Sequence, residues 1–122
     1  MDGRVQIPVI RYLQERFAAD FVDVISEPGP NRILSEDSDI SAVESIERRI
    51  EISVENHGSV GIAVVGHHDC AGNPSSTAEQ NQHTTAAVLR IRSSFPHIPV
   101  VGLWVGDNWE VIELKDNSAN NH

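Results

Sequence analysis

Two short apolar runs, residues 60–65 and 100–105, constrain the fold of this chain more than any other feature. Neither run alternates with polar residues, and such continuous runs are typical of strands that are covered on both faces. A segment with helical features lies between them. Because strands that alternate with helices form βαβ units, we expect an α/β domain of three layers, with a mainly parallel sheet between helices.

The N-terminal third is predicted to hold one helix and one strand. Residues 8–19 read as a helix, because Val9, Leu13 and Phe17 recur at helical spacing and Pro8 suits a first turn. Residues 21–25 (FVDVI) read as a short strand, so 22–25 would join the two apolar runs as central strands of the sheet. The prolines of 26–31 and the acidic residues of 35–39 indicate loops.

Two further helices and one strand complete the prediction. A helix is expected from about 40 to 56, with a capping box at 41–44 and a stop at Gly58; a second capping box at 76–79 begins a helix that runs to about 95. Residues 109–114 read as an antiparallel edge strand. We therefore assign 1–114 to a single domain and 115–122 to a polar, frayed tail. No strand precedes the first helix, so residues 1–4 resemble the end of a βα connection whose strand lies outside this sequence.

Composition excludes several classes of partner. The chain has 122 residues and a formal net charge of −9, from 18 acidic and 9 basic residues. Nucleic acid and anionic membrane surfaces both favour a basic patch, so neither is an expected partner. The sequence shows neither an apolar run long enough to span a bilayer nor a signal peptide. A single cysteine rules out an internal disulfide and fits a reducing cytoplasm.

Residues with side chains that can bind a metal or take part in catalysis follow the first apolar run. Residues 66–72 read GHHDCAG, and in them His67 and Cys70 form a His-x-x-Cys pair. Imidazole and thiolate are ligands that Zn²⁺ prefers, and the carboxyl ends of strands are where open α/β sheets place their sites. His67 and Cys70 are therefore candidate metal ligands. The alternatives are a hydrogen-bonded loop histidine and a buried structural cysteine.

A nucleophilic role for Cys70 is a third alternative. It would place the chain among the phosphatases or sulfurtransferases. A phosphatase loop needs an arginine six residues after the cysteine, and that position is Ser76. No arginine or lysine occurs between Cys70 and Arg90, so an anionic substrate would lack a cationic partner there.

The segment 66–72 resembles the Gly-His-x-x-Cys-Gly-Gly signature of the β-class carbonic anhydrases. In that family a Cys-x-Asp-x-Arg motif ends the first strand, and Asp2 and Arg4 fit its last three positions. The missing cysteine would lie directly before Met1, so we expect the native protein to start upstream. Residues 26–29 (SEPG) stand in place of the family's Arg-Asn-Ala-Gly stretch, so the resemblance does not identify the substrate.

The resemblance implies a zinc-dependent lyase that hydrates CO₂ or a related small molecule, working as a homodimer. His67 and Cys70 would be two of three zinc ligands. Arg4 would hold the Asp2 carboxylate away from the metal, and Asp2 would accept the proton of the water that the zinc activates. If the pair opened, Asp2 could become a fourth ligand. The alternative is a catalytically inactive, carbonic anhydrase-like metal-binding or interaction protein. With two ligands alone, the chain as given should bind zinc poorly.

Overall fold

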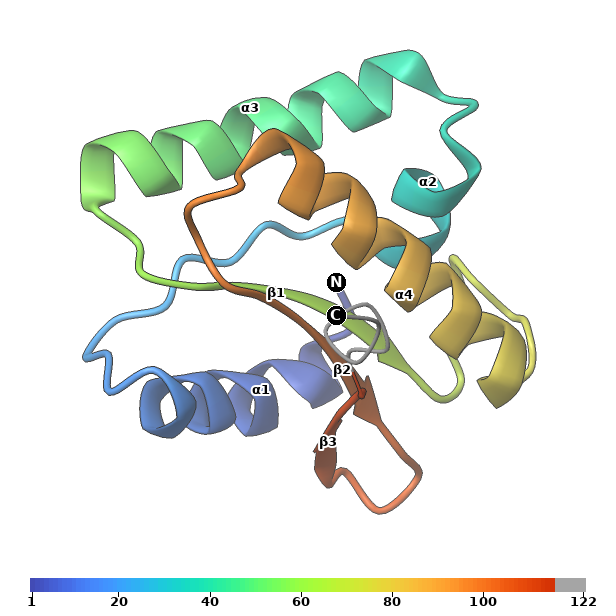
Figure 1. Cartoon of the computed structure of the whole chain (residues 1–122). Coiled ribbons are helices and arrows are strands. Elements are labelled where there is room, and N and C mark those ends of the chain that lie inside the picture. Colours follow the sequence, from blue (N-terminus) through green and yellow to red (C-terminus); the bar gives the residue numbers. More distant parts are fainter. Residues whose placement is uncertain (116–122) are drawn as a thin grey trace.

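The fold is α/β, as the sequence predicts. A computed structural model describes residues 1–115. Its elements in chain order are α1 (Gly3–Arg16), α2 (Pro30–Glu36), α3 (Ile40–His57), β1 (Ile62–His67), α4 (Thr77–Ser94), β2 (Val100–Val105) and β3 (Val111–Glu113) (Figure 1).

The sheet is mixed and has the order β1-β2-β3. β1 and β2 run parallel, in a register from Ile62 opposite Val100 to His67 opposite Val105, and α4 connects them as the predicted βαβ unit. β3 is the predicted antiparallel edge strand, although it is shorter than 109–114. Of the predicted strand 60–65, the structure keeps 62–65 and extends the strand through Gly66 to His67. His67 is therefore the last residue of the strand, beside β2.

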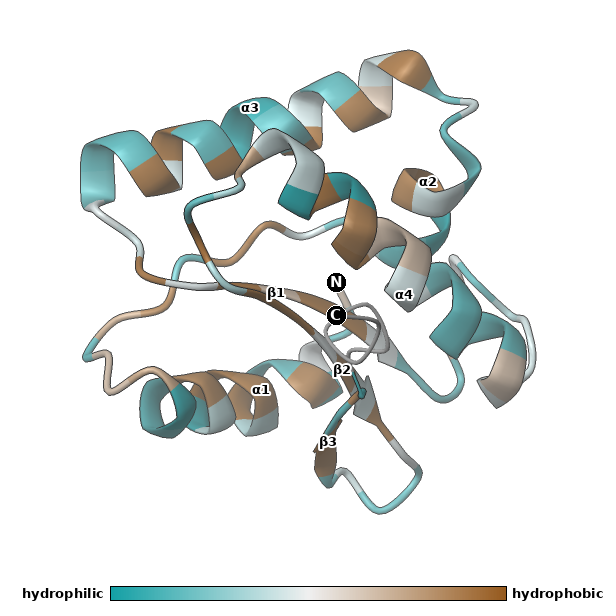
Figure 2. Cartoon of the chain, in the orientation of Figure 1, coloured by the Kyte–Doolittle hydropathy of each residue, from teal (hydrophilic) through white to brown (hydrophobic). Residues whose placement is uncertain are grey.

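Helices pack on the sheet through two separate hydrophobic clusters. The larger cluster joins α2, α3 and α4 to β1 and β2, and the smaller one joins α1 to β2 (Figures 1 and 2). The buried members of the larger cluster are Leu34, Val43, Ile46, Ile50, Val64, Ala87, Val88, Ile91 and Val100. Those of the smaller cluster are Val5, Val9, Leu103 and Val105. Figure 2 shows both long strands as largely hydrophobic, as expected for strands in a core.

The predicted strand at 21–25 is wrong. These residues form no strand, and Phe21 and Val24 are 91% and 53% exposed. The residues match the composition of a strand, but no described strand lies beside them to pair with their backbone. A β composition without a partner does not make a ladder.

The start of α1 and the cap of α3 differ from the prediction. α1 begins at Gly3 because Asp2 caps it, accepting a hydrogen bond from the Arg4 amide, so Pro8 lies inside the helix. α3 is capped by Asp39 and not by Ser41, since the Asp39 side chain accepts from the Ala42 amide. At 76–79 the helix start is confirmed: Ser76 caps α4 by accepting from the Glu79 amide, and its hydroxyl also donates to the Glu79 carboxylate, in place of the reciprocal bond of a capping box.

The helix α2 was not expected. Pro30 occupies its first turn, where the missing N–H costs nothing, and Gly29 before it adopts a positive φ of 68°. Gly29 and Pro30, which indicate a loop in the sequence, here begin a helix. None of the helices in residues 1–115 is long and apolar enough to cross a membrane. The predicted tail lies outside the described residues, apart from Lys115.

Candidate active site

Three of the four predicted site residues line one cavity. The cavity has a volume of about 500 Å³, and its lining includes Asp2 before α1, His67 at the end of β1 and Cys70 in the following turn. Arg4 is not in the lining but bonds Asp2 directly. The fold thus brings the two sequence motifs, more than 60 positions apart, to the same place.

Asp2 and Arg4 form a two-pronged ion pair. The Arg4 Nε donates to both carboxylate oxygens of Asp2, at 3.0 and 3.1 Å, and Nη2 donates to Oδ2 at 2.6 Å. Asp2 Oδ1 also accepts from the Arg4 amide at 2.9 Å, as the cap of α1. The hydrogen bonds from the Arg4 side chain and amide hold the pKa of Asp2 far below its usual range, and the nearby His67 adds a smaller effect in the same direction. The Asp2 side chain therefore stays a carboxylate at neutral pH.

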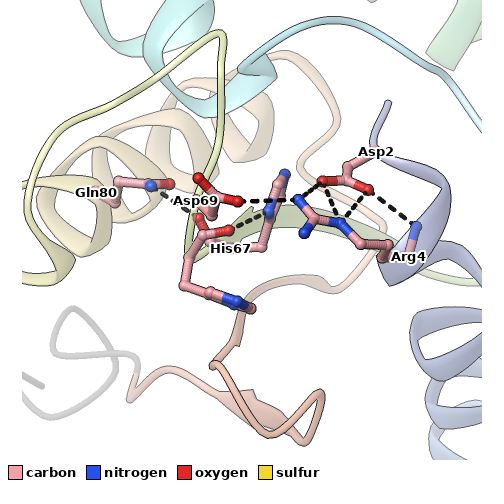
Figure 3. Close-up of polar contacts among 6 residues, drawn as sticks. Asp2, Arg4, His67, Asp69 and Gln80 are labelled. Carbon is pink, nitrogen blue, oxygen red and sulfur yellow. Dashed lines mark hydrogen bonds and ion pairs between the residues drawn. The ribbon is translucent and has the colours of Figure 1, made fainter.

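Arg4 has two further neighbours that the sequence did not point to. Its Nη2 donates to Asp69 Oδ2 at 3.3 Å, and its guanidinium carbon lies 5.1 Å from the centre of the Trp109 ring. Figure 3 shows the Arg4 guanidinium between the carboxylates of Asp2 and Asp69. From the sequence we expect Asp69, at a variable position of the motif, either to contact the residues that form the site or to be exposed, and we expect Trp109 to serve in a turn or the core. Neither contact follows from a spacing in the sequence, because loops carry both residues to Arg4.

His67 is held in one tautomer. Its side chain is buried, with 5% exposure for the residue, and Nδ1 lies 2.7 Å from the carbonyl oxygen of His68. A carbonyl only accepts, so Nδ1 carries a proton, and in the neutral ring Nε2 then has a free lone pair. The His67 carbonyl oxygen in turn accepts from Gln80 Nε2 of α4 at 2.8 Å (Figure 3). A histidine with an orienting bond at Nδ1 is arranged as metal-ligating histidines are.

A buried polar network stands behind His67. Asn31 of α2 donates to Gln80 Oε1 at 3.3 Å and to Thr84 Oγ1 at 3.1 Å, and Asn73 donates to Asn31 Oδ1 at 3.2 Å. All four of these side chains are 1% exposed or less. The network ties the loop after β1 to α2 and α4, which fixes the loop that carries Cys70.

Cys70 is a free, buried thiol in a tightly packed loop. It is 7% exposed, and its carbonyl accepts from the Asn73 amide at 3.3 Å. Two residues on, the Gly72 backbone is pressed against Pro28: a Cβ placed on Gly72 would lie 2.3 Å from the Pro28 carbonyl carbon. The 26–29 loop, in which the chain departs from the family pattern, is therefore a direct neighbour of the site.

These residues fit zinc in kind but not in number. His67 and Cys70 offer an imidazole and a thiol, both typical zinc ligands, and Asp2 lines the same cavity. Within residues 1–115, however, no group of three or more His, Cys, Asp or Glu side chains is arranged to hold a metal ion. A catalytic zinc site uses three protein ligands. One ligand would have to come from outside this arrangement.

Comparison with known proteins agrees with the family resemblance seen in the sequence motifs. Residues 1–115 match the protein family described as "Putative carbonic anhydrase". Neither the search of curated proteins nor the search of solved structures found a match. The match spans all the residues that the structure describes, including both sequence motifs. The chain therefore belongs to this carbonic anhydrase family.

Proposed function

We propose that the protein is a zinc-dependent lyase that hydrates CO₂ or a related small molecule. One observation carries the proposal: a carboxylate held ionised by Arg4 lines the same cavity as His67, whose Nε2 is free, and Cys70. Hydration by a zinc enzyme needs thiolate and imidazole ligands for the metal, a proton acceptor, and a group that positions the acceptor, and these residues are of those types.

Each residue has a stated role in this proposal. His67 Nε2 and the Cys70 sulfur would hold the zinc, which lowers the pKa of a bound water to about 7 when present. Asp2 is ionised across the neutral range because its pKa is low, and it would accept the proton of the water in a hydrogen bond. Arg4 holds the Asp2 carboxylate by the two-pronged pair, so the carboxylate keeps a fixed direction.

We propose that a further strand beside β1 completes both the sheet and the metal site. The Ile62 amide donates to the Pro99 carbonyl and the His68 amide to the Val105 carbonyl, so even-numbered residues of β1 face β2. Odd-numbered residues, Ala63 and Val65 among them, then present their backbone groups to the other edge. That edge pairs with no described strand, and both residues line the 500 Å³ cavity. A parallel strand there would give the mainly parallel, three-layer fold expected from the sequence.

The third zinc ligand would be a cysteine at the end of this strand. The experiment compares the present chain with one extended at its N-terminus by an apolar strand that ends in Cys directly before Met1. Elemental analysis should find little zinc in the present chain and about one zinc per extended chain. Stopped-flow assays should then detect CO₂ hydration only in the extended chain.

Single substitutions in the extended chain test the assigned roles. His67→Ala and Cys70→Ala should abolish zinc binding, whereas His97→Ala, at an exposed histidine, should not. Asp2→Asn should keep the zinc and lower the hydration rate, because it removes the proton acceptor and not a ligand. Full zinc occupancy that survives Cys70→Ala would show that the metal binds elsewhere.

A second candidate is an inactive metal-binding or interaction protein of the same family. The altered 26–29 loop against the Gly72 backbone favours it, because this loop borders the site. Full zinc content without hydration in the extended chain would support this candidate.

A homodimer remains our proposal for the working unit in either case. Ile7 and Met1, at the start of the chain, are 60% and 65% exposed and would be available to a partner. Sedimentation at high concentration should show dimers, and a monomer alone would count against the proposal.

A further inference from the structure

Trp109 reaches Arg4 from a turn that is built to hold it. The turn joins β2 to β3, and in it the Trp109 amide donates to the Gly106 carbonyl at 3.0 Å and the Glu110 amide to Asn108 Oδ1 at 3.1 Å. Trp109 has a φ of +61°, which is rare for a large side chain. The turn thus fixes an unusual backbone conformation at the residue whose ring meets the guanidinium.

The guanidinium of Arg4 is restrained from three directions. Asp2 binds one side of it, Asp69 Oδ2 accepts from Nη2, and the Trp109 ring packs against it. Asp69 also has a positive φ, of 54°, and its side chain is 74% exposed. The indole also contacts the His68 ring, with the two ring centres 4.6 Å apart and the planes tilted by 56°, and this contact helps to hold the indole in place.

We propose that Trp109 and Asp69 are positioning residues that keep the Arg4 guanidinium on Asp2. Arg4 has a long side chain that is 49% exposed, and an exposed ion pair alone is a weak, salt-screened restraint. An aromatic face and a second carboxylate limit the guanidinium to one plane and one position, which suits the planar geometry of arginine. The consequence for the site rests on the proposed function, because only there does the direction of the Asp2 carboxylate matter.

A purely structural role for Trp109 must be separated from this one. The indole also packs beside the smaller hydrophobic cluster, so its loss could lower stability without concerning Arg4. The decisive measurement is therefore local: hydrogen exchange and chemical shift of the Arg4 Nε–H, followed by ¹⁵N NMR in the metal-free chain. Arg16 is an internal control, because it also lies over a ring, that of Phe17, and also bonds a carboxylate, that of Glu113.

Trp109→Leu should accelerate Arg4 Nε–H exchange about tenfold and leave Arg16 unchanged. Trp109→Phe should restore most of the protection, because it returns an aromatic face. Asp69→Asn tolerates the same positive φ and should accelerate exchange by a smaller factor. If Trp109→Leu does not fold, Trp109→Met replaces it, since methionine fills the space without a ring. Wild-type exchange in a folded Leu or Met variant would overturn the role of Trp109, and wild-type exchange in Asp69→Asn would overturn that of Asp69.

The functional arm uses the zinc-loaded extended chain. Trp109→Leu should lower kcat for CO₂ hydration at unchanged zinc content, with little effect on KM, and Trp109→Phe should recover part of kcat. An unchanged kcat in Trp109→Leu would overturn the catalytic consequence. If the extended chain hydrates no CO₂ at all, the proposed function fails, while the exchange data on Arg4 still decide whether Trp109 and Asp69 position it.

Discussion

Replacing Gly72 by alanine should loosen the loop that carries Cys70. The new Cβ would lie 2.3 Å and 2.5 Å from the Pro28 carbonyl carbon and oxygen, and 2.7 Å from the Gly29 amide nitrogen. These are backbone atoms, which cannot rotate away, so we place the cost at about 3 kcal/mol, the upper end for overpacking. Alanine recovers about 0.7 kcal/mol by restricting the unfolded chain. The net loss is about 2 kcal/mol, or about 8 °C in Tm for a chain of this size.

Two other glycines separate the clash from the other effects of the substitution. Gly3 and Gly58 each have open space where a Cβ would stand, and Gly58 alone of these two has a positive φ, of 69°. Gly3→Ala, in the first turn of α1, should therefore raise stability by about 0.5 kcal/mol. Gly58→Ala should lower it by about 1 kcal/mol, from backbone strain alone.

The single thiol provides the matching local assay. Because Cys70 is the only cysteine of the chain and is buried, its reaction rate with a disulfide reagent reports the opening of this one loop. Gly72→Ala should speed the reaction under native conditions, and Gly3→Ala should not. If Gly72→Ala melted as the wild type does and its thiol reacted no faster, the packing of Gly72 on the 26–29 loop would not be what holds Cys70.

Three further predictions concern bonds that the structure shows. Arg4→Gln should raise the pKa of Asp2 toward its ordinary value. A carboxyl whose pKa is lowered in the folded state stabilises the fold at pH values above its ordinary pKa, so the variant should be less stable than the wild type at pH 7, and this difference should shrink as the pH falls below about 4. Urea unfolding at several pH values measures the difference. Asn31→Ala should cost about 3 kcal/mol in denaturant unfolding, because it strands buried polar partners. Burial and the bond to Glu113 raise the pKa of Tyr12, so its phenol should ionise above pH 10 in an ultraviolet titration, and Tyr12→Phe should remove that late step.

The parts of the fold that the sequence predicted are those with a long, regular pattern. α3, α4 and β2 match closely, because apolar spacing and continuous apolar runs report burial directly. The sequence pattern predicted the wrong structure where the outcome depends on neighbouring segments of the fold. Residues 21–25 have the composition of a strand, but no strand within residues 1–115 lies beside them to pair with. The helix α2 was missed because Pro30 is typical both of a loop and of the first turn of a helix.

The residues of the sequence motifs in the candidate site could be predicted, but the residues that hold them in place could not. The His-x-x-Cys spacing indicated His67 and Cys70, and the resemblance to the carbonic anhydrase motif indicated Asp2 and Arg4. The fold brings the two pairs together although they lie at distant positions. The contact of Trp109 with Arg4 depends on the direction of one short turn with a positive φ. The buried network around Asn31 was equally hidden, because an asparagine after two prolines and a glycine suggests an exposed turn.

The Asp2 carboxylate has two roles at once, because it caps α1 and also pairs with the Arg4 side chain. If zinc were bound and Asp2 turned to become its ligand, α1 would lose its cap in the same event. If the first turn frays when the cap is lost, the two equilibria are linked, and linkage is reciprocal: whatever strengthens that turn then disfavours capture of Asp2 by the metal. Gly3→Ala, far too small a change to touch the cavity, would therefore bias the site toward its open state, and the Arg4 amide would report that state through its hydrogen exchange.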